Sequence, residues 1–352
     1  MAVGSLWREV FGDPIPREAG RFLRERTEKK FIYWTSRRVV IPVIIEVLTP
    51  MIIRHNDPEE LFSLDVEAPG KGMVTVPAIL GTKVSGELRR RMQQILRDAY
   101  ALWSGEVDSL LGSAGLPGYK GSYTCMVTVT TRKGGQEEAV VPGYCKRCPA
   151  CALMGYAVEA GNEVNTISRV DKDTFYSTSR LIDAMVKITR NKVDDISFTT
   201  GQALFEANAV KPGTLFVGVI TLRDVTEAEL LFTLKALSEM ERLGAVKTIF
   251  GAVRTHIPVV AFSYGRLATG YELAGEIIAL GLSSKDEILK HVAEKIAGIA
   301  GQDRAYVADV SGIMRAKSID DLKSVILEAW SDAAVRRKMV LAEAGLSNKT
   351  GK

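Results

Sequence analysis

KPGTLFVGVITLRDVTEAELLFTLKALSEMERLG, residues 211–244, is the stretch that indicates the fold most directly. Its residues 213–222 are apolar and rich in β-branched side chains, which predicts a buried strand. Thr226 and Glu229 have the spacing of a capping box, so we expect a helix to begin there and to end at Gly244. A strand that leads directly into a helix indicates a mixed α and β fold, and the other elements extend outward from this unit.

The other core segments also alternate between strand and helix patterns. Residues 43–53 are apolar and β-branched and predict a core strand, whose pairing should begin after Pro42 because proline has no N–H to donate. In residues 85–103 apolar side chains recur at helical spacing, with Ser85 as the expected cap. Apolar pieces at 246–253 and 257–262 predict a further strand. The core order is then strand, helix, strand, strand, helix, strand, as in ferredoxin-like and RNA-recognition-motif folds.

We therefore predict an α+β protein whose core is a modified ferredoxin-like or RNA-recognition-motif fold with large insertions. The core is expected to span residues 40–265, followed by a helical part at 266–352. Residues 1–38 alternate basic and acidic groups, which predicts a solvated helix or arm. Within the core, the expected insertions are residues 54–82, a small hairpin module at 122–155 and a loop or lid at 170–200.

Composition and charge narrow the functional class only slightly. The 352 residues carry a net charge of +4, which says little about partners unless the charge is clustered. No apolar run reaches the roughly 18 residues of a membrane helix, and the N-terminus lacks the apolar stretch of a secretory signal. We therefore expect a cytoplasmic protein with no membrane partner. In a reducing compartment, four clustered cysteines favour metal binding over disulfides.

All four cysteines belong to one predicted hairpin. YTCMVTVTT (123–131) alternates like a strand, RKGGQ supplies a turn, and EEAVV returns toward the triplet in YCKRCPAC. The hairpin would bring its two ends together, so the spacing C-x19-C-x2-C-x2-C offers four thiolates to one zinc ion with no position open for water. The predicted ligands of this structural zinc are Cys125, Cys145, Cys148 and Cys151.

Three alternatives to a four-cysteine zinc site stay open at this point. First, His55, His256 or His291 could replace one cysteine and relieve the strain of three closely spaced ligands. Second, C-x2-C-x2-C also occurs in iron–sulfur proteins, although the usual continuation x3-C-P is absent here. Third, the triplet could be three small buried residues without metal.

Three segments resemble one known superfamily. PAILGTKVSGELRR (77–90) resembles the loop and helix start of the repeat-associated (RAMP) CRISPR proteins. CPACALMGYAV (148–158) is similar to their Cys-Pro-x-Cys-x-Leu-Phe-Gly stretch, with Met154 where phenylalanine is usual. Residues 211–244 resemble their late strand–helix unit. Together the segments look most like the backbone subunit of a type I CRISPR interference complex, and most similar to the type I-D version.

This resemblance implies a function in guide-RNA binding. It implies a modified RNA-recognition fold that assembles with itself along single-stranded guide RNA, holds the sugar–phosphate backbone without distinguishing sequence, and contacts other subunits of the complex. The chain departs from the family pattern after the late helix, where the usual Gly-rich loop appears only as IFGAVRTHIP (249–258).

Candidate RNA contacts cluster at the start of the helix expected from residue 85. A helix N-terminus attracts phosphate, Lys83 and Ser85 stand at it, and Arg89 and Arg90 begin the exposed face. The competing interpretation is an ordinary solvated helix face. Phe175 and Tyr176 could stack on bases or pack in the core. Secondary candidates for RNA contact are Arg37, Arg38, Arg54, Arg169 and Lys172.

No established catalytic motif occurs in the chain, so we expect a protein that is not an enzyme. The alternative function is an RNA endonuclease. Related type III backbone subunits use an aspartate in the loop after the first strand, and here that loop contains Asp57 with His55 nearby. Asp57 precedes Pro58, a pair that is common in turns, which favours the interpretation without catalysis.

Overall fold

An antiparallel sheet runs through the computed structural model, which describes residues 3–28, 31–54, 61–126, 130–133, 136–139, 143–157, 164–193 and 200–346. Over these residues the sheet has nine strands in the order β13-β12-β1-β10-β7-β3-β2, with β11 added to β1 and β6 added to β10. The strands are β1 (Arg38–Val47), β2 (Ser63–Ala68), β3 (Gly72–Ile79), β6 (Val170–Lys172), β7 (Phe175–Ser177), β10 (Leu215–Arg223), β11 (Val253–His256), β12 (Val259–Ser263) and β13 (Ala305–Val307).

The central strand β1 contains Pro42, and the prediction that pairing begins after this residue is wrong. Pro42 is opposite Val219 in the register with β10. On the other side, β1 pairs with β12 up to Val40 and with β11 from Ile44 onward. Proline therefore lies where the neighbouring chain passes from one strand to the next, so its missing N–H leaves no ladder bond unmade.

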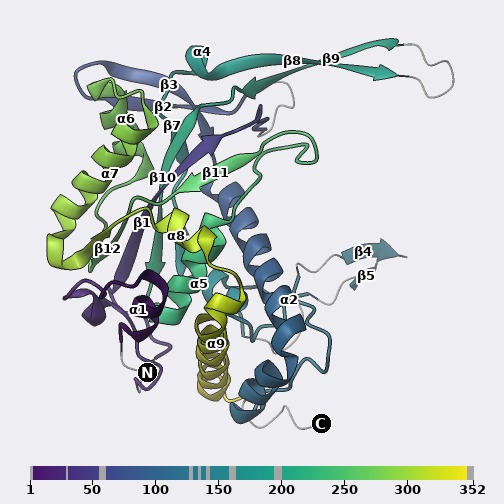
Figure 1. The fold of residues 1–352 in the computed structure, drawn as a ribbon. Helices are drawn as coiled ribbons and strands as arrows, with labels where there is room; N and C mark the ends of the chain where they lie inside the picture. The colour runs from purple at the N-terminus through teal and green to yellow at the C-terminus, as the bar shows by residue number, and fades with distance from the viewer. Residues whose placement is uncertain are drawn as a thin grey trace.

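Helices cover both faces of the sheet (Figure 1). Alternate residues of β1 point to opposite faces, so that Val39 and Ile41 join one core cluster and Val40 and Ile44 the other. One face is covered by α6 (Gly270–Leu280) and α7 (Lys285–Ala300). The other is covered by α1 (Ser5–Phe11), α2 (Gly81–Ser113), α3 (Pro149–Met154), α5 (Glu227–Ser238), α8 (Val310–Ala316) and α9 (Lys323–Glu343). The fold is therefore mixed α and β, with a helical C-terminal region.

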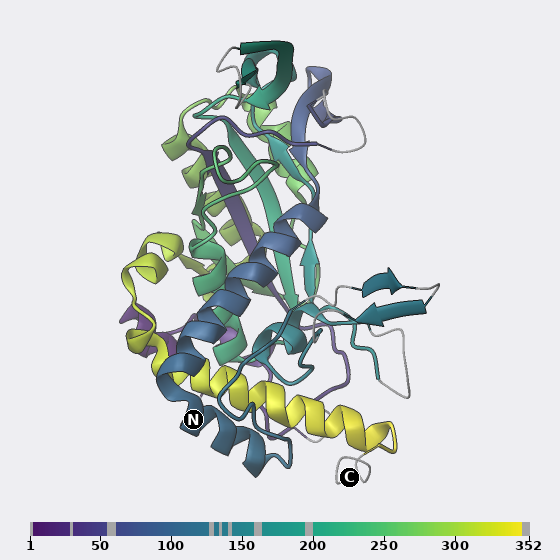
Figure 2. The same ribbon diagram turned by 90° about the vertical axis from the view of Figure 1, so that its right-hand side faces the viewer.

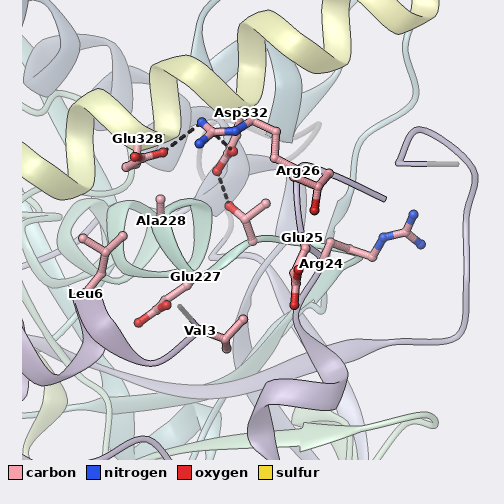
Figure 3. A pocket seen from close by; sticks show the side chains of 11 residues that line it. Val3, Leu6, Arg24, Glu25, Arg26, Glu227, Ala228, Glu328 and Asp332 are labelled. Atoms are coloured by element: carbon pink, nitrogen blue, oxygen red, sulfur yellow. Dashed lines mark hydrogen bonds and ion pairs between the residues drawn. The ribbon is translucent and has the colours of Figure 1, made fainter. Parts of the chain in front are cut away.

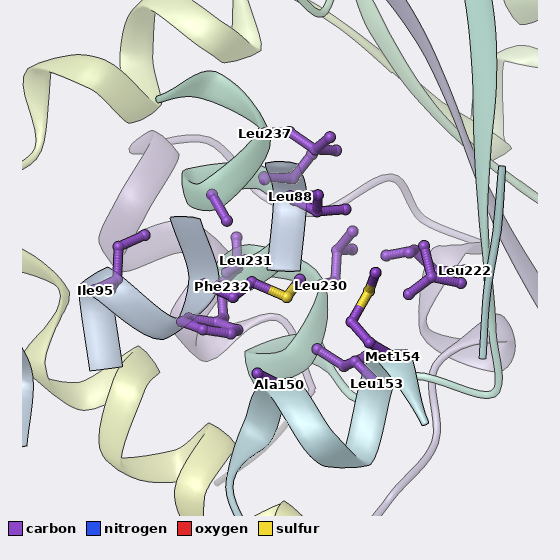
Figure 4. Close-up of a cluster of buried hydrophobic side chains, with 14 of the residues drawn as sticks. Leu88, Ile95, Ala150, Leu153, Met154, Leu222, Leu230, Leu231, Phe232 and Leu237 are labelled. Carbon is purple, nitrogen blue, oxygen red and sulfur yellow. The ribbon is translucent and has the colours of Figure 1, made fainter. Parts of the chain in front are cut away.

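The strand–helix unit predicted from residues 211–244 is present. β10 is buried along its length, and α5 begins with the expected capping box of Thr226 and Glu229. The helix ends at Ser238 and not at Gly244, which instead adopts a left-handed φ of 88° six residues later. Every residue of α5 is buried, and Leu153 and Met154 of α3 approach it (Figure 4).

Helix α2 begins earlier than its sequence pattern indicates. Its cap position is Leu80, without a side-chain cap, so Ser85 lies inside the helix and does not cap it. A Cβ on Gly81 would stand 2.5 Å from the Asp173 carbonyl oxygen and 2.6 Å from that of Lys172, so only glycine allows this approach to the β6–β7 turn. The helix continues beyond Trp103, where non-helical φ and ψ angles mark a kink, to Ser113.

Two smaller hairpins extend from the sheet (Figure 2). One is formed by β8 (Met185–Val193) and β9 (Thr200–Val210), preceded by the short helix α4 (Leu181–Ala184). The other is formed by β4 (Thr130–Lys133) and β5 (Gln136–Ala139), within the hairpin module predicted at 122–155. The segment 54–82, expected as an insertion, supplies the β2–β3 hairpin at one edge of the main sheet.

The chain before β1 packs against the core, so the prediction of a solvated N-terminal arm is wrong. Trp7, Phe22 and Phe31 are at most 1% exposed. Their scattered spacing between charged residues conceals the buried face from a sequence pattern. Toward the C-terminus, β13 joins the sheet beside β12, and α6 to α9 pack on both faces. Among the described residues, no helix is both long and apolar enough to cross a membrane.

Candidate nucleic-acid interface and metal centre

The N-terminal half of α2 carries the predicted RNA contacts on two of its flanks. Lys83 and Arg90 are exposed on one side of the helix. Ser85 and Arg89 are half-buried and one helical turn apart on the other side. The positive charge of Arg89 acts on Lys172 of β6. The predicted contacts on this helix therefore fall into two groups, one on each flank.

The first group opens into a cavity of about 370 Å³. Arg54, Lys83, Arg90 and Lys247 line it, and none of its described lining residues is acidic. The remaining walls are apolar or small and consist of Met51, Ile53, Ile79, Thr82, Gly86, Leu243, Gly244 and Ala245. A hollow that gathers four cations beside the first turn of a long helix is suited to an anion.

One donor of a residue that lines this cavity has no partner among the described residues. The Nε atom of Arg54 is buried and has no hydrogen-bond acceptor among the described residues. A buried donor without a partner is unfavourable, so this part of the Arg54 side chain is not stabilised by the described residues. Glu87, at the edge of the cavity, is the nearby counter-charge: it accepts from Arg90 Nη2 at 2.7 Å and pairs with Lys247. Among the described residues, one carboxylate against four cations leaves the cavity positive.

The second group is partly occupied by protein contacts. Arg89 donates to the carbonyl oxygen of Gly155, and its guanidinium lies 4.6 Å from the centre of the Tyr144 ring. Burial, together with the charge of Arg89, lowers the pKa of Lys172. Arg89 thus joins α2 to the cysteine module, while Lys172 is the more available cation of this pair.

The other predicted contacts lie elsewhere. Arg37 pairs with Glu28 at 2.7 Å, and Arg38 begins β1, at the end of the strand remote from Arg54. Arg169 is 2% exposed and paired with Glu229, so it is a structural residue, in contrast to its predicted role as an RNA contact. Sequence alone does not distinguish a buried arginine from an exposed one.

The two aromatic candidates pack inside the protein. Phe175 is fully buried against Gly218, where any side chain would collide with its ring. Tyr176 packs against the cluster beneath α6, with its ring 5.8 Å from that of Tyr271. Both residues therefore pack against the protein core, which was the alternative to stacking on bases.

The four cysteines converge on one point. All four Sγ atoms lie within 4.8 Å of one another. Cys125 Sγ is 3.5 Å from Cys151 Sγ and 3.7 Å from Cys148 Sγ, and all four cysteines are free of disulfides. Around one ion with metal–sulfur bonds of about 2.3 Å, a tetrahedron has sulfur–sulfur edges of about 3.8 Å. The group could therefore hold a single metal ion.

Surrounding side chains orient the sulfurs. Gln93 of α2 donates to Cys125 Sγ at 3.6 Å, the Tyr119 hydroxyl lies 3.1 Å from Cys145 Sγ, and the Cys151 N–H donates to Cys148 Sγ at 3.4 Å. Burial raises the pKa of the Cys148 thiol, and a bound cation would offset this by stabilising the thiolate. These contacts tie the cysteine group to α2.

Comparison with known proteins identifies the family. The family model described as "Csc2 Crispr" matches residues 90–338. The chain belongs to the Csc2 CRISPR family. This confirms the resemblance to the type I-D backbone subunit that residues 77–90, 148–158 and 211–244 indicated. No curated protein matches the chain.

A solved structure of a Csc2 protein shares the fold of this Csc2-family chain. The crystal structure of Thermofilum pendens Csc2 aligns with a TM-score of 0.66 and 22% identity, over 94% of this chain and 96% of that one. A chain of a CRISPR RNA-guided surveillance complex in a pre-nicking state aligns with a TM-score of 0.46 and 11% identity, over 74% and 89%. A chain of a type IV-B CRISPR complex has a TM-score of 0.39 and 17% identity, over 62% and 90%.

Lys247 is the member of the cavity that sequence reasoning missed. It lies between Gly244 and Gly251, both with left-handed φ, in the loop after α5. A cation between two glycines just before IFGAVRTHIP was the available signal, but only the tertiary fold brings it beside α2. His55 and Asp57, the residues of the nuclease alternative, lie outside the described residues.

The histidine alternative for the metal site can be tested at two of its three positions. His256 Nε2 lies 2.8 Å from Glu46 Oε2 on the sheet, and His291 lies beside Glu276 on the helices of the other face. Neither belongs to the group of four sulfurs. Within the described residues, the cysteines alone form this site.

A polar pocket of about 150 Å³ lies at the start of α5 and is separate from the basic cavity (Figure 3). In it, Arg26 pairs with Glu328 at 2.8 Å, and Asp332 accepts from the Thr226 hydroxyl at 2.6 Å. Burial and the nearby Glu229 raise the pKa of Asp332 to about 7. Its groups bond mainly to one another, which indicates a structural link between the N-terminal segment, α5 and α9.

Proposed function

We propose that the chain binds single-stranded guide RNA, independently of sequence, as the repeating backbone subunit of a CRISPR interference complex. The observation that carries this proposal is the cavity beside α2, which Arg54, Lys83, Arg90 and Lys247 line and whose described lining includes no acidic residue. Membership of the Csc2 family supports it.

The cavity has the chemistry to bind a phosphate. A phosphate at the first turn of α2 would face the positive end of the helix dipole. Arg54 and Arg90 can donate to it, and Lys83 and Lys247 add charge without fixed direction. On the other flank, Ser85, Arg89 and Lys172 offer positions for a neighbouring phosphate. Contacts to phosphate and sugar hold a strand but carry no sequence information.

The core that presents this site is, on this proposal, a modified ferredoxin-like or RNA-recognition-motif fold. The adjacent strands β12-β1-β10-β7, with α2 after β1 and α5 after β10, support the assignment because this is the order of a βαββαβ sheet. Both helices lie on one face, and the domain limits 40–265 and 266–352 follow the same scheme.

We propose that the metal at Cys125, Cys145, Cys148 and Cys151 is zinc and that it is structural. The sulfur separations match the edges of a ZnS4 tetrahedron, and soft thiolates favour zinc over harder cations. An iron–sulfur cluster would spread the cysteines over several irons, two on each iron in a [2Fe–2S] cluster and one on each in a [4Fe–4S] cluster, which needs at least some of the sulfurs farther apart. With four protein ligands, the ion would keep no open position for water. It would fasten the module to α2.

In this role the chain is not catalytic. Its partners are guide RNA, further copies of itself along that RNA, and other subunits of the interference complex. Cutting of RNA at Asp57 is the rival function, and incubating single-stranded RNA with divalent metal tests it, because metal-dependent cleavage that Asp57→Ala abolishes would overturn the non-catalytic proposal.

Fluorescence anisotropy with labelled single-stranded RNA tests the binding site. We expect affinity to fall steeply with salt, and Lys83→Ala/Arg90→Ala to weaken all sequences alike, with the salt slope reduced by about 2. Lys290→Ala is the control, because this exposed lysine lies on α7, on the other side of the sheet. An unchanged affinity and slope in the double variant would show that α2 is not the binding surface.

A further inference from the structure

Two arginines face each other across the central strands, at the end remote from the cavity. Arg38 begins β1, Arg223 ends β10, and the two are direct partners in the antiparallel register. Like charges at opposed positions destabilise a sheet. Asp171 accepts from Arg223 Nε at 2.5 Å, whereas Arg38 has no carboxylate partner among the described residues. The described chain therefore leaves this pair with excess positive charge.

Both arginines lie on the sheet face that α6 and α7 cover elsewhere. Val40 and Val219, two and four residues away on the same strands, belong to the cluster under these helices. Arg38 is half-buried and the Arg223 side chain is 34% exposed, so the helices stop short of this end of the face. In RNA-recognition motifs, the sheet face is where aromatic side chains stack on bases.

An exposed indole stands beside the pair. Trp34 is 45% exposed, and the Arg223 guanidinium lies 5.3 Å from the centre of its ring. The segment that holds Trp34 is fixed next to Arg223, because the Thr35 N–H donates to Asp224 Oδ2 at 2.6 Å and the Asp224 N–H donates to the Arg37 carbonyl at 3.1 Å. A fixed aromatic surface next to cations is the arrangement that binds single strands.

We propose that Arg38, Arg223 and Trp34 form a second site for single-stranded nucleic acid. A phosphate between the two arginines would relieve their repulsion, and the adjacent base would stack on Trp34. The exposed indole favours a nucleic acid over an acidic protein segment. This site goes beyond the proposed guide site, because β1 spans about 30 Å between them and they open on opposite faces.

Tryptophan fluorescence and anisotropy on the full chain test the proposal. The probes are labelled and unlabelled oligouridine and oligothymidine of roughly ten nucleotides, the site size of such platforms. We expect both to quench the fluorescence of Trp34, measured as the difference between the native chain and Trp34→Phe. Arg38→Ala/Arg223→Ala should weaken the affinity measured by this quenching by about fivefold or more. Lys290→Ala should leave that affinity unchanged. A stronger response to one oligonucleotide identifies RNA or DNA as the ligand.

Repeating the titration in the Lys83→Ala/Arg90→Ala background separates the two sites. Quenching at Trp34 that persists there supports an independent site, even if the proposed guide site fails its own test. Equal quenching in the native chain and Trp34→Phe would overturn the proposal, as would quenching that survives Arg38→Ala/Arg223→Ala. If that double variant instead changes the sedimentation of the chain while nucleic-acid binding is unchanged, the patch contacts protein and the proposal is wrong.

Discussion

The basic cavity beside α2 and the buried cluster around Arg169 both contain arginines, but these arginines differ in burial and in their hydrogen-bond partners. Arg169 donates to Glu229 Oε2 at 2.8 Å, to the Asp224 carbonyl at 3.0 Å and to the Ala152 carbonyl at 3.1 Å, inside the protein. In the cavity, the Arg90 side chain is 58% exposed and the Arg54 Nε has no partner among the described residues.

This difference separates arginines that stabilise the fold from arginines that are available to bind a ligand. The Arg169–Glu229 pair links the start of β6 to the first turn of α5, and Arg169 also donates to the Ala152 carbonyl of α3. The two charges therefore stabilise the fold. In the cavity, Arg90 and Lys247 share a single carboxylate, Glu87, so the described cations keep an excess of positive charge for an anion. A positive charge in the sequence is therefore a binding candidate only once its burial and partners are known.

The largest expected effect is on stability, from Arg169→Ala. Removing this arginine leaves Glu229 buried without its ion-pair partner, which should lower the free energy of unfolding by about 3–5 kcal/mol. Urea unfolding followed by circular dichroism measures it. Arg90→Ala, which loses only an exposed pair, is the matched control and should stay within about 0.5 kcal/mol. Equal midpoints for both variants would remove the distinction between the two regions.

The metal centre should come next. Cys148→Ser removes a fully buried ligand and should lower the free energy of unfolding by about 3 kcal/mol, with bound zinc falling from one per chain toward none. Metal analysis and urea unfolding check both parts. RNA affinity should change less, because the cavity cations do not contact the cysteines. Loss of RNA binding in a chain that keeps its stability would contradict this.

A smaller effect concerns pH. Burial raises the pKa of Asp332 to about 7, above the usual 3.8, so the folded chain binds this proton more tightly than the unfolded chain. Its contribution is present below about pH 4 and is lost as the pH rises to about 7. Asp332→Asn keeps an acceptor for Thr226 and should be more stable than the native chain at pH 8 by roughly 2 kcal/mol. Unfolding curves at pH 5 and 8 measure the difference in stability between the variant and the native chain, and the same difference at both pH values would contradict the prediction.

Short sequence patterns predicted those elements whose structure depends on residues close together in the chain. The β-branched run at 213–222 and the capping box at Thr226 predict a strand and a helix start without tertiary information, and both are present. The cysteine group could be predicted for the same reason, because the type and spacing of its ligands can be read from the sequence.

Features that depend on tertiary packing were not accessible from the sequence. α2 begins at Gly81 because glycine allows a close approach to the β6–β7 turn, which no cap residue announces. Trp7 packs against Phe262 of β12 and Tyr306 of β13, which are distant in sequence, and Lys247 reaches the cavity only through the loop after α5. Arg169 looked like a surface cation until its pairing with Glu229 was visible.

Ultraviolet crosslinking of single-stranded RNA to the full chain, followed by peptide mass mapping, tests the central claim most directly. The account predicts crosslinks to peptides that contain Lys83, Arg90 and Lys247, and none to the buried Arg169. Crosslinks that avoid α2 and the loop after α5, in RNA that is bound with the expected salt dependence, would contradict it.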